Sequence, residues 1–354
     1  MLVKNIKRLT SLLIVLLLLA PTCSAFASGE NEEERHNNLA FSEERGMEFL
    51  EKVNYEGELR NPVGLLNLSG ELEAFCFEIY PQGYIIVNCV NGTIPEFSPE
   101  APSPVADFTK EEVFYNGPLD YYVSDTKSFI HTVTGLEVAK KEIVEVYNSI
   151  LYPLEGSIRE SDDLPTRSVE SKQLNATLST FKSTTSSYFC TITGCAIMLD
   201  YYRRCYSGTS LPSGVTTYTQ ICKFLIDNRY IPNCALFLSN AKNGITVTVK
   251  YTGLVSYFNR KDITTRTVNV TGYSFSNVRT QIKANRPMLL EVTGAYAGLG
   301  NTGSHTVTIH GYYVGNVELW RELYIVVNNG WGSNNVWLSV DSGTSKLRDT
   351  LYFS

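Results

Sequence analysis

The sequence predicts an α+β fold in which helices come first and antiparallel strands follow. Segments 190–204, 217–228 and 276–284 have the apolar spacing, or the capping and stop signals, of helices. Short stretches with strand character follow, at 288–292, 305–314, 322–328, 336–340 and 349–353. This order indicates a helical half and an antiparallel β half within the C-terminal part of the chain.

Composition divides the chain into a short leader and two larger regions. A length of 354 residues suits two domains of ordinary size. Residues 28–166 contain acidic, helix-leaning stretches, whereas residues 167–354 are richer in Thr, Tyr, Val and Gly. We expect the first region to fold as a separate α+β domain. The charged segment 154–172 reads as a linker that a protease could cut.

The first 27 residues have the pattern of a secretory signal. Basic residues come first, an apolar run covers 12–20, and Ala25-Phe26-Ala27 forms an A-x-A cleavage site. The apolar run is shorter than the roughly 20 residues that span a bilayer. The prediction is therefore export to the extracellular side, with no stable membrane association after cleavage.

Three further segments are predicted in the N-terminal region. Residues 74–80 and 84–88 flank Pro81-Gln82-Gly83 and predict a β-hairpin. The closely spaced prolines of 92–104 predict an extended loop, because proline fits neither a helix interior nor a central strand. Apolar spacing over 136–151 predicts a helix.

Charge and cysteine content narrow the function classes. A net charge of -6 argues against a nucleic-acid partner, which requires a basic surface. Of eight cysteines, Cys23 lies in the signal, so an odd number remains and at least one thiol stays free. The cysteines lack C-x-x-C spacing and the histidines do not cluster, so we expect no metal and no cofactor.

Cys190 is the candidate nucleophile. It is the first residue of a predicted helix, where unpaired N–H groups and the helix dipole stabilise a thiolate. A single cysteine in an apolar segment is otherwise an ordinary small buried residue. What favours catalysis is the presence of a suitable base and orienting group later in the chain.

His305 is the candidate base, because it opens an alternating strand directly after Gly303-Ser304. His310 lies on the opposite face of the same strand, so only one of the two can face Cys190. A strand histidine can also be purely structural. We choose His305 for its position at the strand entry.

Asn329 is the candidate that orients the imidazole, and Trp331 would shield their hydrogen bond from water. Asn328 is the rival, and Asn-Asn-Gly is also an ordinary turn sequence. An oxyanion would need a donor besides the Cys190 backbone N–H. Residues 181–189 contain no asparagine or glutamine, which leaves Gln173 and Asn175 as the nearest upstream amides, and Gln173 is the candidate we choose.

The C-terminal motifs together resemble double-glycine-type and related papain-like bacterial cysteine peptidases. The residues that carry the resemblance are Cys190 with Ala196, Met198 and Tyr201-Tyr202, then Asn285-Arg286-Pro287, His305 with Gly311-Tyr312, and Asn329-Gly330-Trp331-Gly332. The segment 77–87 is similar to a hairpin in the propeptide of streptopain-type peptidases. The resemblance implies a papain-like peptidase domain over 167–354, preceded by an inhibitory propeptide with its linker over 28–166.

The resulting expectation is a secreted cysteine endopeptidase made as a zymogen. Cys190, His305 and Asn329 would hydrolyse protein or peptide substrates through a thioester, with the propeptide as intramolecular inhibitor. Two alternatives stay open. The same fold could carry out another acyl transfer, as an amidase or transglutaminase does, or could be an inactive module that binds peptides.

Overall fold

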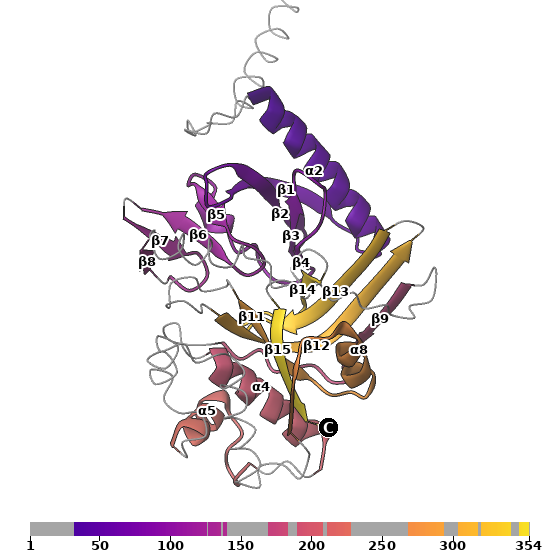
Figure 1. Ribbon diagram of the computed structural model, residues 1–354. Helices are drawn as coiled ribbons and strands as arrows, with labels where there is room; N and C mark the ends of the chain where they lie inside the picture. Colours follow the sequence, from indigo (N-terminus) through magenta and orange to yellow (C-terminus); the bar gives the residue numbers. More distant parts are fainter. Residues whose placement is uncertain are drawn as a thin grey trace, which may run out of the picture.

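The computed structural model describes residues 32–125, 127–135, 137–139, 169–182, 190–207, 211–227, 268–293, 304–317, 320–340 and 347–353. The predicted signal and residues 154–168 of the predicted linker lie outside these ranges. The described elements are helices and strands in an α+β arrangement, as predicted (Figure 1). Among the helices described, none has the length and apolar character needed to cross a membrane.

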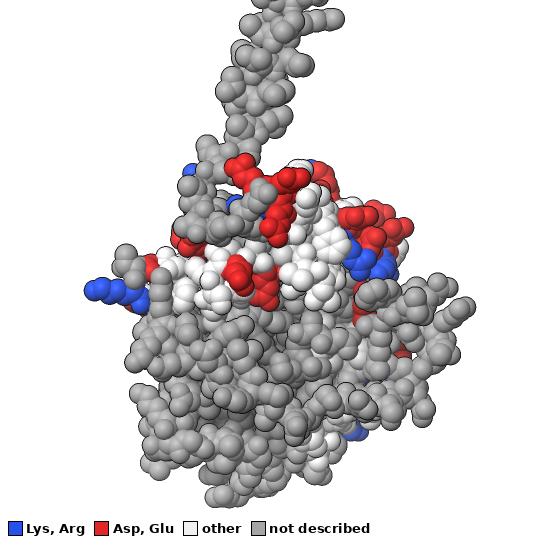
Figure 2. Space-filling view, turned by 45° about the horizontal axis from the view of Figure 1, so that its top comes forward, with Lys and Arg blue, Asp and Glu red and all other residues white. Residues whose placement is uncertain are grey.

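The described part of the N-terminal region has a long helix packed on a set of strands. Helix α2 (Glu32–Lys52) begins with three glutamates and ends with Lys52, which suits the helix dipole. It packs on β1 (Glu58–Leu66), β2 (Leu72–Tyr80) and β3 (Tyr84–Asn88). Strands β2 and β3 pair as the predicted hairpin. Figure 2 shows more acidic than basic side chains on the described surface of this part, in keeping with the negative net charge.

Two predictions for this region need correction. The proline-rich segment contains a strand, β4 (Glu96–Ser98), which is possible because the prolines flank it. Further strands follow: β5 (Val113–Tyr115), β6 (Tyr121–Ser124), β7 (Ser128–His131) and β8 (Glu137–Ala139). Strand β8 pairs with β7, so the predicted helix is wrong for its first residues. The remainder of 136–151 lies outside the described residues.

The C-terminal region confirms the predicted helices and strands. The helices described here are α4 (Cys190–Cys205), α5 (Tyr218–Asp227) and α8 (Phe275–Lys283), and Ser274 caps α8. The strands are β11 (Met288–Thr293), β12 (Ser304–Val317), β13 (Trp320–Asn328), β14 (Val336–Ser339) and β15 (Leu347–Phe353), and unpredicted strands β9 (Val169–Gln173) and β10 (Val268–Gly272) join them.

The sheet of this region is covered on both faces. Alternate residues of β11 point to opposite sides: Leu289 packs with α4 and α5, whereas Met288 packs with α8. The face under α4 is therefore distinct from the face on which α8 lies. This division matters because α4 begins with Cys190.

One continuous sheet joins the two regions. Strand β14 pairs with β4 through Trp337 opposite Phe97, so the N-terminal strands extend the C-terminal sheet. A shared aromatic cluster reinforces the junction, with Phe49 and Tyr324 at 5.5 Å and Phe97 and Trp337 at 5.5 Å between ring centroids. The two regions thus meet through backbone pairing as well as apolar packing.

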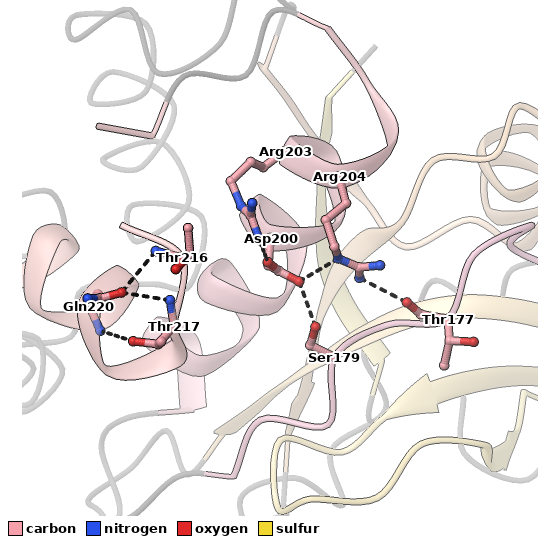
Figure 3. Close-up of polar contacts among 8 residues, drawn as sticks. All are labelled: Thr177, Ser179, Asp200, Arg203, Arg204, Thr216, Thr217 and Gln220. Carbon is pink, nitrogen blue, oxygen red and sulfur yellow. Dashed lines mark hydrogen bonds and ion pairs between the residues drawn. The ribbon is translucent and has the colours of Figure 1, made fainter. Parts of the chain in front are cut away.

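A buried carboxylate fixes the chain that leads toward Cys190. Asp200 of α4, which is 3% exposed, accepts hydrogen bonds from Ser179, Arg203 and Arg204 at 2.6, 2.6 and 2.8 Å (Figure 3). Arg204 also donates to the carbonyl of Thr177 at 3.0 Å. Burial opposes ionisation of Asp200, but these three donors prevail and lower its pKa. The neighbouring α5 begins with a capping box in which Thr217 and Gln220 bond each other's backbone N–H (Figure 3).

Replacing Asp200 by alanine should destabilise the protein by about 2 kcal/mol, because it leaves Ser179 and two guanidinium groups without their shared acceptor. The measurement is urea unfolding of the variant beside the parent. The exposed Asp107→Ala serves as the matched control and should change stability little. Equal unfolding midpoints for Asp200→Ala and the parent would contradict the anchoring role.

Candidate active site

Cys190 is the first residue of α4, as predicted, and its side chain is largely buried at 9% exposure. At a helix start the backbone N–H groups lack intrahelical acceptors. Its Sγ lies 4.0 Å from Oγ1 of Thr191. The thiol therefore lies at the positive end of a helix that is buried along most of its length.

A direct bond joins the start of α4 to the strand that carries His305. Oγ1 of Thr191 and Oγ1 of Thr306 are 2.9 Å apart. The helix approaches this strand closely at Gly194, where an added Cβ would lie 3.1 Å from Leu289 and 3.2 Å from Thr306. Side chains alternate along a strand, so Thr306 faces α4 and His305 points to the other face of β12. The bond therefore places the start of α4 beside the end of the strand that carries His305.

His305 is fully buried and held in a fixed orientation. Its Nε2 lies 2.6 Å from the backbone carbonyl oxygen of Asn329. Since a carbonyl can only accept, Nε2 carries the proton and Nδ1 is left as the basic nitrogen. The indole of Trp331 stacks on the imidazole with centroids 4.3 Å apart and planes at 16°. Trp331 thus covers one face of the imidazole ring.

Asn329 contributes differently from the expectation. Its side-chain Oδ1 accepts from the backbone N–H groups of Trp331 at 2.9 Å and Ser333 at 3.1 Å. The bond to His305 comes from its backbone carbonyl. The amide side chain therefore holds the turn that carries Trp331, and the carbonyl holds the histidine.

The rival residues are engaged elsewhere. Asn328 accepts from the backbone of Gly330 at 2.8 Å and donates to the carbonyl of Ser179 at 3.3 Å. His310 receives the backbone N–H of Asn335 at 3.5 Å, and burial lowers the pKa of His310 to about 4. Both residues thus connect the strand end to surrounding loops.

Gly330 lies where the helix start and the histidine converge. A Cβ built on it would lie 3.7 Å from Thr193 and 3.8 Å from Cε1 of His305, and its φ is +72°. Gly330→Ala should lower the free energy of unfolding by about 1 kcal/mol, because a Cβ is disfavoured at positive φ. Thermal unfolding measures this. Gly272→Ala, which has open space at ordinary φ, is the control; an equal loss there would contradict the explanation.

The structure does not bring Gln173 to this site. It lies on β9 opposite Gly311, six positions beyond His305 along β12 and thus about 20 Å away by strand rise. Its amide donates to Oδ1 of Asn335 at 3.1 Å. Gln173 precedes Cys190 in the sequence, but no sequence pattern indicates that β9 pairs with β12.

Two N-terminal residues at the site were not predicted. The ring of His131 lies 5.4 Å from that of Trp331, and burial followed by the charge of His305 lowers the pKa of His131 to about 4. Leu119 belongs to the buried cluster that contains Trp331. No local motif marked either residue, because Trp331 lies 200 positions or more beyond both of them in the sequence.

Within the described ranges, His, Cys, Asp and Glu form no group of three that could hold a metal ion. What the arrangement offers is a thiol at a helix start, an oriented imidazole and an aromatic cover. These are the parts that thiol-dependent acyl transfer requires.

Comparison with known proteins agrees with this chemistry. The model of the Peptidase_C39 like family matches residues 171–346, which include Cys190, His305, Asn329 and Trp331. No curated protein matches the sequence. The family match supports a cysteine peptidase of the C39 type, a thiol-dependent hydrolase, for the C-terminal region of this chain.

Proposed function

We propose that this protein is a secreted cysteine endopeptidase of papain-like fold, made as a zymogen, with Cys190 as nucleophile, His305 as base and Asn329 as orienting residue. The observation that carries the proposal is the convergence at Gly330, where an added Cβ would lie 3.7 Å from Thr193 of α4 and 3.8 Å from Cε1 of His305. There the helix that begins with the Cys190 thiol comes close to an imidazole whose orientation is fixed by the carbonyl of Asn329. Substrates would be proteins or peptides.

The proposed reaction uses these groups in turn. Nδ1 of His305 takes the thiol proton, and the thiolate of Cys190 attacks the scissile carbonyl carbon. The backbone N–H of Cys190 stabilises the oxyanion. The intermediate collapses to a thioester while the imidazolium gives its proton to the departing amine. Water, deprotonated by His305, then hydrolyses the thioester and restores the thiol.

The N-terminal region would act as the inhibitory propeptide. The ring of its His131 lies 5.4 Å from that of Trp331, which covers the proposed base, and its Leu119 belongs to the same buried cluster as Trp331. Activation would then require a cut in the linker. Localisation outside the cell follows from the signal pattern and is part of the proposal.

Strand β9 limits the part of the linker in which cleavage is expected. Glu170 bonds Arg279, Lys283 and Tyr312, and although burial opposes it, these bonds lower its pKa to about 2. Residues 169–173 also pair with β12. We therefore expect the processed chain to begin before Val169, which N-terminal sequencing of the mature form would show. A mature N-terminus after Gln173 would contradict this expectation.

The proposed activity is tested by mass-mapped labelling with a peptide-like epoxide thiol probe, beside casein cleavage. Cys190 should label rapidly in the processed protein, and His305→Ala should remove the selectivity. Selective labelling without cleavage of any peptide would indicate another acyl transfer. If Cys190 labels no faster than the other cysteines, even after the linker is cut, the chain is a non-catalytic peptide-binding module.

A further inference from the structure

We propose that the phenol of Tyr218 donates the side-chain hydrogen bond to the oxyanion, the role for which the sequence suggested Gln173. This inference rests on the proposed function, because it adds a catalytic residue to that reaction. The reaction needs a donor besides the backbone N–H of Cys190, and β9 holds Gln173 about 20 Å from His305. Tyr218 is the first residue of α5 and is only half-buried, so the protein does not enclose it.

The first observation is a hydrogen bond between Tyr218 and the first turn of α4. The hydroxyl oxygens of Tyr218 and Thr193 are 2.9 Å apart, and Thr193 is fully buried. Thr193 lies three residues after Cys190 in the helix. Residues at this spacing lie on the same side of a helix, with Cβ atoms roughly 5–6 Å apart. The phenol is therefore held at the same end and on the same side of α4 as the thiol.

The second observation is that Thr193 also lies toward the proposed base. A Cβ built on Gly330 would lie 3.7 Å from Cγ2 of Thr193 and 3.8 Å from Cε1 of His305. Thr193 thus has the phenol at its hydroxyl group and the glycine beside His305 at its methyl group. A substrate carbonyl that Cys190 attacks and His305 serves would lie at this end of α4, where the phenol is the side-chain donor that Thr193 presents.

The third observation is that the phenol ring is held in place before any substrate binds. The ring of Phe181 lies 4.9 Å from that of Tyr218, with the planes at 35°. Lys182, the next residue, forms a β-bridge with Trp331, which stacks on His305. The capping box at the start of α5 fixes the backbone that carries the phenol, and α5 packs on α4 (Figure 3). A donor fixed in this way needs little reorganisation during the reaction.

The phenol keeps its proton while it acts. Burial raises the pKa of Tyr218 to about 12, and the bond with Thr193 opposes this shift. A hydroxyl group both donates and accepts, so Thr193 can donate to the phenol oxygen while the phenol donates to the oxyanion. The carbonyl oxygen gains an electron pair when the thiolate adds and returns it when the thioester forms. No proton passes from Tyr218, and His305 carries out every proton transfer.

The first measurement is hydrolysis of a fluorogenic peptide by the processed Tyr218→Phe variant. We expect kcat to fall about 10²-fold with KM nearly unchanged, because the hydrogen bond strengthens only as the oxyanion develops. Tyr206→Phe is the matched control. The half-buried phenol of Tyr206 bonds the carbonyl of Asn285 at 2.7 Å, just beyond the opposite end of α4. This control should keep the kcat of the parent.

Two reactions of Cys190 separate an oxyanion donor from a structural role. Alkylation by iodoacetamide displaces iodide and forms no oxyanion, so Tyr218→Phe should leave its rate unchanged. A peptide aldehyde adds the thiolate to its carbonyl, and the oxygen of the tetrahedral product occupies the oxyanion position. The inhibition constant of the aldehyde should therefore rise about tenfold in Tyr218→Phe.

Thr193 provides a second route if Tyr218→Phe folds poorly. Thr193→Val removes the hydroxyl that holds the phenol and should lower kcat, whereas Thr193→Ser keeps a hydroxyl and should lose less. Equal kcat for these two variants would overturn the proposal. So would a Tyr218→Phe variant with the kcat or the aldehyde inhibition of the parent, an iodoacetamide rate that falls together with kcat, or an equal loss in Tyr206→Phe.

These outcomes leave the peptidase assignment intact provided that cleavage still depends on His305. If the parent protein cleaves as fast after His305→Ala, the proposed function fails, and the role of Tyr218 fails with it.

Discussion

His305→Ala should lower kcat/KM by about 10³-fold or more, whereas Asn329→Ala should lower it by only about tenfold. Removing the base eliminates proton transfer from Cys190 and to the leaving amine. The atom that orients His305 is the backbone carbonyl of Asn329, at 2.6 Å from Nε2, and alanine retains it. The measurement is hydrolysis of a fluorogenic peptide by the processed protein.

The side chain of Asn329 stabilises the turn, because its Oδ1 accepts hydrogen bonds from the backbone N–H groups of Trp331 and Ser333. Removing this side chain should therefore lower the stability of the protein and loosen the cover of Trp331 over His305, with only a small effect on kcat/KM. Asn328→Ala is the neighbouring control for general loosening of this segment. If Asn329→Ala is as inactive as His305→Ala while Asn328→Ala is active, the side-chain amide is the orienting group and our interpretation is wrong.

Mild acid should destabilise the full-length chain between pH 6.5 and about 4. Burial lowers the pKa of both His131 and His310 from 6.5 to about 4. Above pH 6.5 the folded and unfolded states are both neutral at these residues. Between the two pKa values only the unfolded state takes up the protons, so stability falls as pH falls, and the loss is complete below about pH 4. Each histidine should account for about 3 kcal/mol.

The measurement is denaturant unfolding at several pH values. His131→Gln can keep a donor toward the carbonyl of Leu119 but does not titrate, so its curve should be flatter than that of the parent. The exposed His36→Gln should leave the curve unchanged. Burial raises the pKa of Glu96, so protonation of Glu96 favours the folded state as the pH falls. In Glu96→Gln we therefore expect stability to fall more steeply with pH than in the parent. An identical pH dependence for His131→Gln and the parent would contradict the role of His131.

The part of the fold that sequence could predict is the part where apolar spacing is regular. The α4 helix and the strands from β11 to β15 have unambiguous periods, and their positions were confirmed. The segment 136–151 shows where this kind of prediction fails. Strand β8 at its start pairs with β7 but has only a few residues, so its alternation of side chains cannot be distinguished from helical spacing.

The candidate site also has features that the sequence could predict and features that it could not. Cys190 and His305 could be chosen from their positions at the start of a helix and of a strand. That the carbonyl and not the amide of Asn329 bonds His305 depends on the path of a turn, which residue types do not encode. The distance of Gln173 and the approach of Leu119 both follow from strand pairing between distant segments.

The pairing of β4 with β14 has a consequence for activation. A cut in the linker breaks one covalent bond, but it leaves Phe97 beside Trp337 and the backbone ladder between these strands unchanged. Removing β4 would also leave β14 as an open sheet edge, prone to pair with other chains. Scission and separation are therefore two events, and we expect the nicked protein to migrate at its original mass under native conditions until a second process displaces the N-terminal fragment.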